Sequence, residues 1–206
     1  KYGNPLFPTV YDEKKWETAA QAAKDVIDMN IYGLVGADGT DPYGSLHDLY
    51  TTVGPVNSVT EMIFSRIVSA YNWGIAATPR MARSRAYGSF GPTQKLVDAF
   101  AMANGRYPIT GYTNGDQTQP IIDPESGYSE TGFSTFTHPI FGDQLANTFM
   151  MYQNREPRFY ATILYNGASW MGRTIESYVG GADGFKEYEN SKSANTTVTG
   201  YYLRKY

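Results

Sequence analysis

The sequence predicts an α+β fold that is mainly helical, with long irregular loops and short antiparallel strands. Residues 11–30 have a clear helical periodicity. The chain of 206 residues contains 21 glycines and 11 prolines, which indicates long irregular connections. The Asn166-Gly167 pair and the later glycine pairs favour short strands joined in hairpins. An apolar content of 41% and a charged content of 18% are typical of a chain that folds around a core.

The first expected element is a helix at residues 11–30. Four apolar residues recur at i, i+4, i+7 and i+11 and share one stripe: Trp16, Ala20, Ala23 and Ile27. Thr9 or Asp12 can cap its start. The stripe is rich in alanine, which lets a neighbouring helix approach closely. Because one helix cannot bury its own stripe, we expect partners outside this chain.

The next segments are expected to alternate between loops and one strand. Residues 33–58 are rich in Gly, Pro, Asp and Thr and are predicted to be a loop with a helical turn near 45–52. Residues 61–69 form a short apolar run of strand type. Residues 71–91 are again predicted to be a loop.

A second helix is predicted at residues 92–105, capped by Thr93 and ended by Asn104 and Gly105. A long polar and aromatic loop is expected at 106–136, and a helical stretch near 143–152.

The opening of the segment that follows, residues 154–157, is predicted to start a helix with Pro157 at the first helical position. The last segment, TGYYLRKY at 199–206, alternates enough to be a strand.

Composition excludes several classes of function. A net charge of −3 argues against nucleic-acid binding, which needs a clustered basic surface. Arg80, Arg83 and Arg85 gather in one segment, where a solvated face is the simpler interpretation. The absence of cysteine excludes disulfides, cysteine-bound zinc and thiol catalysis.

The sequence gives little information on location. No run approaches the roughly 20 apolar residues of a membrane span. The chain opens with Lys1 and is expected to be a mature piece or an excised fragment, with any targeting signal elsewhere.

No catalytic, cofactor or metal site is predicted. His47 and His138 have no partner at metal-ligand spacing, and the nucleotide-binding and hydrolase motifs are missing. Residues 38–41 resemble a calcium loop but lack its ligand spacing and closing glutamate. A pair of catalytic carboxylates stays possible among 20 acidic residues, although none has a recognisable catalytic context.

Sugar binding requires less than catalysis. Aromatic faces and planar polar groups suffice, and the 18 tyrosines offer such half-wet surfaces. Residues 71–85 and 107–119 contain this mixture of side chains. The alternative is that these aromatic residues anchor their loops to the body of the protein.

Four stretches together resemble one family. They are KKWETAAQAAKDVID at 14–28, PTQKLVDAFAMANG at 92–105, NREPRFYATILYNGASW at 154–170, and TGYYLRKY at 199–206. Their patterns and order are similar to those of the SusD/RagB family of nutrient-binding outer-membrane lipoproteins. Glu156 departs from the aspartate that is usual before the proline, and Asn154 is expected to help cap the helix.

The resemblance implies part of a SusD-like fold with tetratricopeptide-like helices. It divides the chain into a tetratricopeptide-like helix region at 1–32 and a SusD-like C-terminal region at 33–206. The family's lipidated cysteine and other helices are not matched, so the chain is expected to be an internal piece of a longer protein. The signature segments are expected to form scaffold, with Arg158 paired to a carboxylate such as Asp98. The residues expected to pack are Leu96, Val97, Phe100, Phe159 and Tyr160.

The function implied by the resemblance is non-enzymatic. Family members bind glycans at the bacterial cell surface and deliver them to a SusC-like TonB-dependent outer-membrane transporter. Attachment to the outer membrane would be through a lipid anchor outside this chain. The alternatives are a peptide-binding member of the family and, less in keeping with the sequence, a carbohydrate-active hydrolase. Residue type and location predict the ligand contacts, which are Trp73, Tyr71, Asn72, Arg80 and Tyr112.

Overall fold

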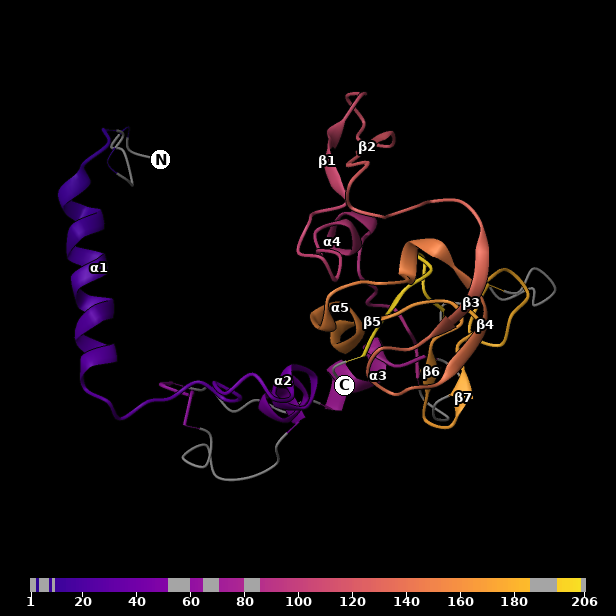
Figure 1. The fold of residues 1–206 in the computed structure, drawn as a ribbon, viewed down its shortest axis with the longest axis horizontal. Coiled ribbons are helices and arrows are strands. Elements are labelled where there is room, and N and C mark those ends of the chain that lie inside the picture. Colours follow the sequence, from indigo (N-terminus) through magenta and orange to yellow (C-terminus); the bar gives the residue numbers. More distant parts are fainter. Residues whose placement is uncertain are drawn as a thin grey trace. The chain divides into compact units, whose positions relative to one another are not determined.

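The computed structural model describes residues 3, 8, 10–51, 60–64, 71–79, 86–185 and 196–204. The chain divides into two compact units. Figure 1 draws both units in one ribbon. Unit 1 comprises Lys1–Gly39 and Val53–Arg66, and unit 2 comprises Thr40–Thr52 and Ile67–Tyr206. The expected division into 1–32 and 33–206 stays a prediction.

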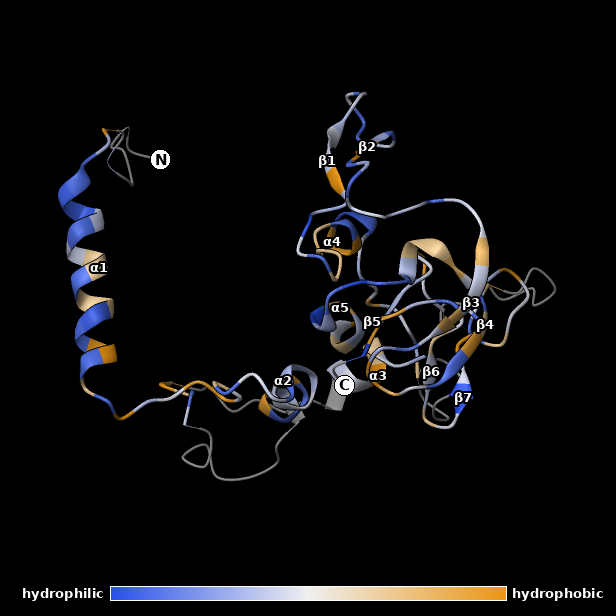
Figure 2. Cartoon of the chain, in the orientation of Figure 1, coloured by the Kyte–Doolittle hydropathy of each residue, from blue (hydrophilic) through white to orange (hydrophobic). Residues whose placement is uncertain are grey.

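Unit 1 is dominated by helix α1, Glu13–Asp28. Asp12 caps it, as expected, because its carboxylate accepts a hydrogen bond of 3.1 Å from the Lys14 amide. No residue of α1 is buried, and Trp16 and Ile27 are 67% and 71% exposed. Figure 2 shows hydrophobic positions between hydrophilic ones along the helix. The apolar stripe is therefore uncovered in the described part of the unit.

The strand predicted at 61–69 is wrong for residues 61–64, which form a turn and a bend, and residues 65–69 lie outside the described part. The carbonyl of Thr60 accepts a hydrogen bond from Gly33, and the Glu61 carboxylate accepts one of 2.9 Å from the Val35 amide. Phe64 is 86% exposed. A strand requires a neighbouring strand to pair with, and apolar composition alone does not provide one.

Unit 2 begins with α2, Pro42–Thr51, a full helix where only a turn was expected. Asp41 starts it, since its carboxylate accepts a 2.8 Å hydrogen bond from Gly44. Helix α3, Tyr71–Ala77, lies where a loop was predicted. Burial of Ile75 and Ala77 against the unit stabilises α3 despite its central glycine.

Helix α4, Gln94–Asp98, is shorter than the predicted helix 92–105. Its cap is confirmed, because Thr93 Oγ1 accepts a hydrogen bond from the Leu96 amide. The helix ends early because distant residues bind the backbone that would continue it. Arg155 donates to the carbonyl of Phe100, and Glu156 accepts from the amide of Ala101.

The last helical elements are the 3₁₀ helix η3, Met150–Tyr152, and helix α5, Pro157–Thr162. Pro157 occupies the start of α5, as predicted. Glu156 is the N-cap residue but its side chain does not cap. Its carboxylate binds Ala101 and Arg158 instead, so the expected Arg158–Asp98 pair is replaced by a 2.6 Å Arg158–Glu156 pair.

The strands in the described part of the chain form two-stranded antiparallel sheets. The pairs are β1 (Ile109–Tyr112) with β2 (Pro120–Ile122), β3 (Phe133–Thr137) with β4 (Gln144–Phe149), β5 (Ile163–Leu164) with β8 (Tyr202–Leu203), and β6 (Ser169–Trp170) with β7 (Arg173–Thr174). Figure 1 shows the β1–β2 hairpin extending from the body of unit 2 beside α4. The strand expected in 199–206 is confirmed as β8, though it is short.

Two further expectations are corrected by these strands. The predicted loop 106–136 contains β1, β2 and the start of β3, and the predicted helix near 143–152 is β4 followed by η3. Cross-strand packing explains the second error, because the Phe133 and Phe149 rings pair at 5.0 Å. A bulge and the left-handed Asn147 (φ 53°) interrupt the alternation that would have marked β4 as a strand.

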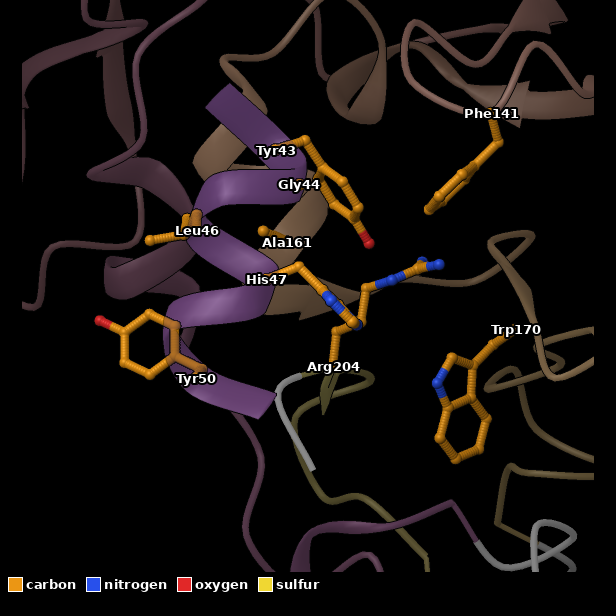
Figure 3. A pocket seen from close by; sticks show the side chains of 9 residues that line it. All are labelled: Tyr43, Gly44, Leu46, His47, Tyr50, Phe141, Ala161, Trp170 and Arg204. Carbon is orange, nitrogen blue, oxygen red and sulfur yellow. The ribbon is translucent and has the colours of Figure 1, made fainter. Parts of the chain in front are cut away.

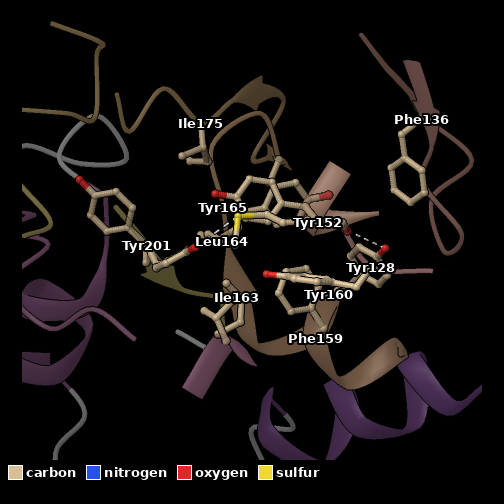
Figure 4. Close-up of a cluster of buried hydrophobic side chains, with 14 of the residues drawn as sticks. Tyr128, Phe136, Tyr152, Phe159, Tyr160, Ile163, Leu164, Tyr165, Ile175 and Tyr201 are labelled. Carbon is tan, nitrogen blue, oxygen red and sulfur yellow. Dashed lines mark hydrogen bonds between the residues drawn. The ribbon is translucent and has the colours of Figure 1, made fainter. Parts of the chain in front are cut away.

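The core of unit 2 is aromatic (Figure 4). Phe159, Tyr160, Ile163, Leu164 and Tyr202 are all completely buried. Their tyrosine hydroxyls are bonded internally, as when Tyr160 donates to the carbonyl of Tyr152 at 2.9 Å. Burial raises the pKa of Tyr160 to about 12, so this hydroxyl stays protonated. Many of the tyrosines are thus core residues.

The expected scaffold role of the signature segments holds at most positions. Val97 is completely buried and Phe100 packs edge-on against Phe159 at 5.8 Å. Leu96 is 43% exposed, so its predicted packing is wrong. The short α4 turns Leu96 outward and Val97 inward.

Candidate ligand-binding grooves

Four of the five predicted contact residues lie in two regions of unit 2, and the fifth is outside the described residues. Trp73 lies on α3, is half exposed, and packs against Phe90 with ring centroids 5.0 Å apart. Tyr71 and Asn72 are on the same helix, but their side chains lie outside the described part. Arg80 is also outside the described residues.

Tyr112, at the end of β1, lines a groove of about 450 Å³ that we call the Tyr112 groove. Elements distant in sequence build it: α4, the β1–β2 hairpin, Glu130 before β3, and the end of β4 with η3. The remaining lining residues are Gln94, Asp98, Gln117, Thr118, Pro120, Phe149 and Met151.

Hydrogen bonds fix the polar wall of the Tyr112 groove. The Tyr112 hydroxyl donates to Asp98 Oδ2 at 3.2 Å, and Gln94 Nε2 donates to Asp98 Oδ1 at 2.7 Å. The Tyr201 hydroxyl donates to Gln94 Oε1 at 2.8 Å. Burial and the negative charge of Asp98 raise the pKa of Tyr112. Tyr112 therefore stays a neutral donor held by a carboxylate.

The hairpin loop and the segment before β3 contribute further planar and hydroxyl groups, including Gln117 and Thr118. Asn114 holds the hairpin loop, since its Oδ1 accepts from the amides of Thr118 and Gln119 at 3.1 and 3.0 Å. Glu130 accepts a 3.1 Å hydrogen bond from the Tyr128 hydroxyl. The groove thus offers donors and acceptors in fixed positions beside the aromatic rings of Tyr112 and Phe149.

A second groove, of about 400 Å³, lies beside α2 and is called the α2 groove (Figure 3). Its walls are mainly aromatic. Phe141 meets Tyr43 edge-on at 5.3 Å, and the guanidinium carbon of Arg204 lies 4.7 Å from the centre of the Phe141 ring. The other lining residues are Gly44, Leu46, His47, Tyr50, Ala161 and Trp170.

A third cavity, of about 700 Å³, is bordered by charged groups that bind one another. Glu156 pairs with Arg158, and Arg155 is buried in the protein behind the cavity. These residues belong to the signature segment at 154–170, which binds the backbone at and after α4, so their contacts are structural.

Among the described residues, no group of three or more His, Cys, Asp or Glu is placed to hold a metal ion. His138 is buried and its Nδ1 accepts from the amides of Ile140 and Phe141 at 3.3 Å each. Within the same part of the chain, none of the helices has the length and apolarity that crossing a membrane requires.

Several groove residues were missed in the sequence. Gln117 and Thr118 fall within the segment 107–119 that has a sugar-binding composition, but Asp98 and Glu130 come from segments interpreted as scaffold or loop. Trp170 and Arg204 stand in stretches that resemble family signatures, and these stretches were interpreted as scaffold.

Comparisons with solved structures agree with the fold. A SusD-like protein, BF3747, from Bacteroides fragilis is 22% identical and superposes with a TM-score of 0.57, covering 94% of this chain and 33% of that protein. BT4246 is 18% identical with a TM-score of 0.61, covering 99% of this chain and 37% of that protein. This chain therefore spans little more than a third of the length of these structures.

The SusD family model matches residues 60–206, so the chain belongs to the SusD family. No curated protein matches the sequence significantly. The resemblance noted from the four stretches is thus confirmed for most of the chain.

Proposed function

We propose that the chain is part of a non-enzymatic protein that binds glycans at the bacterial cell surface. Membership of the SusD family supports a nutrient-binding role. The observation that carries the proposal is the Tyr112 groove, where Tyr112, Asp98 and Gln94 form one hydrogen-bonded wall. A pyranose presents alternating hydroxyls and an apolar face, and this wall offers a matching combination of polar groups and rings.

Rigidity favours binding in this groove. Gln94 is itself fixed by Tyr201, and the hairpin loop is fixed by Asn114, so little side-chain freedom is lost when a ligand is bound. Trp73, with Tyr71, Asn72 and Arg80, is proposed as an additional contact for longer ligands, since half of the Trp73 side chain is open to solvent.

The finer parts of the proposal follow from the family. The intact protein would deliver its glycan to a SusC-like TonB-dependent transporter in the outer membrane. It would be held there by a lipid anchor outside this chain, and α1 would pack its exposed stripe among tetratricopeptide-like helices. Co-purification of the intact protein with a transporter from outer membranes tests this partnership, and its failure in detergent-solubilised membranes would contradict it.

Binding is tested by titrating the intact protein with a panel of neutral oligosaccharides and, in parallel, a peptide library. We expect a neutral oligosaccharide to bind in the micromolar-to-millimolar range. Tyr112→Ala should weaken it by about 1–2 kcal/mol, because both the ring and a fixed donor are lost. Tyr107→Ala, at an exposed tyrosine outside this groove, is the matched control. If only peptides bind, the peptide-binding alternative would replace the glycan-binding proposal.

One observation favours a second candidate function. Asp98 and Glu130 are two carboxylates that line the same groove, as the acid and base of a glycoside hydrolase do. Incubation of the bound oligosaccharide with the protein tests this candidate. Under the proposed function no shorter product forms. A product that disappears in Glu130→Gln would establish the hydrolase instead.

A further inference from the structure

We propose that the α2 groove is a second binding site, specific for an oligosaccharide that carries an anionic substituent such as a carboxylate. The two grooves have no described lining residue in common. The inference therefore rests on its own contacts and can fail without affecting the Tyr112 groove.

The charges of the two grooves differ in sign. Among the residues that the structure describes, the α2 groove is lined by Arg204 and by no Asp or Glu, whereas the Tyr112 groove is lined by Asp98 and Glu130 and by no Lys or Arg. Asp48 lies 3.4 Å from His47 Nδ1, but its side chain is exposed and does not line the groove. A negative ligand is thus favoured in the α2 groove and disfavoured in the other.

Arg204 is positioned to accept a carboxylate. Its Nη1 donates to the carbonyl oxygen of Ser169 at 3.2 Å, and its guanidinium lies against the Phe141 ring. Among the residues that the structure describes, no acidic side chain forms an ion pair with Arg204. The planar group is held in place with donors to spare, which is the arrangement that binds carboxylates in a bidentate manner.

The aromatic walls fit the sugar ring that would carry the anion. Phe141 contacts Tyr43 edge-on, and the His138 ring stacks on Phe141 at 4.7 Å. Figure 3 shows Tyr43, Phe141 and Arg204 directed toward the same space, with Trp170 beside it. A rigid aromatic surface next to one fixed cation favours an acidic sugar over a free inorganic anion, which would leave the rings unused.

The test compares two ligands of the same length and linkage on the intact protein, an oligogalacturonide and the neutral galactose oligomer. Calorimetric titration at low and high salt should show the acidic ligand binding at least about tenfold tighter, with the preference decreasing as salt screens the charge. A sulfated galactose oligomer separates the two sources of charge. If only the carboxylate-bearing ligand binds more tightly than the neutral one, the recognition is bidentate. If the sulfated ligand gains the same affinity, the groove accepts anionic substituents in general.

Variants assign the preference to Arg204. Arg204→Gln should reduce the preference for the acidic ligand to about twofold or less. Arg204→Lys should retain part of the preference, because lysine keeps the charge but lacks the planar guanidinium. Arg106→Gln removes the same charge from an exposed arginine near β1 and should leave the preference unchanged. In Tyr112→Ala, binding of the acidic ligand should persist while binding of the neutral ligand falls.

Two results would overturn the inference. One is equal affinity of the wild-type protein for acidic and neutral ligands, or an acidic preference that salt does not weaken. The other is a preference that survives in a folded Arg204→Gln protein. Should that variant fail to fold, the salt series on the wild type and Arg204→Lys still decide. Loss of acidic binding in Tyr112→Ala would place both ligands in one groove and also contradict the proposal.

Discussion

Arg155 Nη2 donates a 2.6 Å hydrogen bond to the carbonyl oxygen of Val97, 58 positions earlier in the chain. The same guanidinium binds the carbonyls of Phe100 and Met151 and lies 4.9 Å from the centre of the Phe159 ring. Arg155 is 1% exposed, and burial lowers its pKa. The link ends α4 and joins the signature segment 154–170 to the segment 92–105, which contributes Gln94 and Asp98 to the Tyr112 groove.

Replacing Arg155 with methionine should destabilise the fold by about 3–5 kcal/mol, because three carbonyls lose a buried charged donor at once. Arg155→Lys should recover only part of this loss, since one ammonium cannot reach all three acceptors in the same plane. Urea unfolding followed by circular dichroism measures both. Arg158→Gln, which breaks an exposed pair, should cost less than about 1 kcal/mol. Similar losses in Arg155→Met and Arg158→Gln would refute the account.

His138 predicts a dependence of stability on pH. Burial, together with the positive charge of Arg204, lowers the pKa of His138 to about 4 from its ordinary value of 6.5. Between these two values the unfolded chain binds more protons than the folded one. The stabilisation is therefore complete above pH 6.5 and is lost as the pH falls toward 4, by roughly 3 kcal/mol in total.

Unfolding free energies of the wild type and His138→Asn, measured from pH 7.5 to 4, test this prediction. The asparagine keeps an acceptor near the amides of Ile140 and Phe141 but does not titrate in this range. The variant should show a shallower loss of stability. His47→Asn, at an exposed histidine, controls for removal of a histidine and should follow the wild type. Identical slopes in the wild type and His138→Asn would contradict the assignment.

Local signals in the sequence identified elements whose ends are set locally. Asp12 and Thr93 cap α1 and α4, and Pro157 starts α5, because a cap depends on residues a few positions apart. The end of α4 was missed because its carbonyls bind Arg155, which no local pattern reveals. Strand β4 was missed because its partner β3 and a bulge determine it.

The ion pair of Arg173 and Asp183 should be a major stabilising contact of the β6–β7 region. Asp183 is completely buried and accepts from both terminal nitrogens of Arg173, at 2.7 and 2.5 Å, and from the Glu176 amide. Arg173→Ala leaves a buried carboxylate without its cation and should cost about 3–5 kcal/mol.

A double-mutant cycle with Asp183→Asn separates the pair from its surroundings. The double variant should be less destabilised than the sum of the two single variants, by more than about 1 kcal/mol. Additive losses would show that the two side chains act independently. Arg106→Ala with Asp123→Asn, a more exposed pair, provides the comparison and should show weaker coupling.

Trp73 should contribute to binding of long oligosaccharides only. Its ring is fixed against Phe90 and half exposed, but it lines neither the Tyr112 groove nor the α2 groove. We expect Trp73→Ala to weaken the binding of a long oligosaccharide by about 1–2 kcal/mol and that of a disaccharide by less than about 0.5 kcal/mol. Tyr178→Ala, at another exposed aromatic residue that lines neither groove, is the control. Equal affinities of wild type and Trp73→Ala for the long ligand would remove Trp73 from the site.

The candidate site was less predictable than the scaffold. Tyr112 and the segment 107–119 were found because exposed aromatic and planar polar residues cluster there in sequence. Asp98 was expected to serve Arg158, yet it binds Tyr112 and Gln94, because α4 ends early and turns this carboxylate toward the hairpin. Arg204 follows β8 and reaches the α2 groove only through the pairing of β8 with β5. Such sites depend on contacts between distant segments.

The most direct measurement is a crystal structure of the intact protein soaked with the neutral oligosaccharide that binds tightest. The account predicts an uncleaved sugar in the Tyr112 groove, with a ring against Tyr112 or Phe149 and hydroxyls within hydrogen-bonding distance of Asp98 or Gln117. A sugar bound away from this groove, or density for a cleaved product between Asp98 and Glu130, would contradict it.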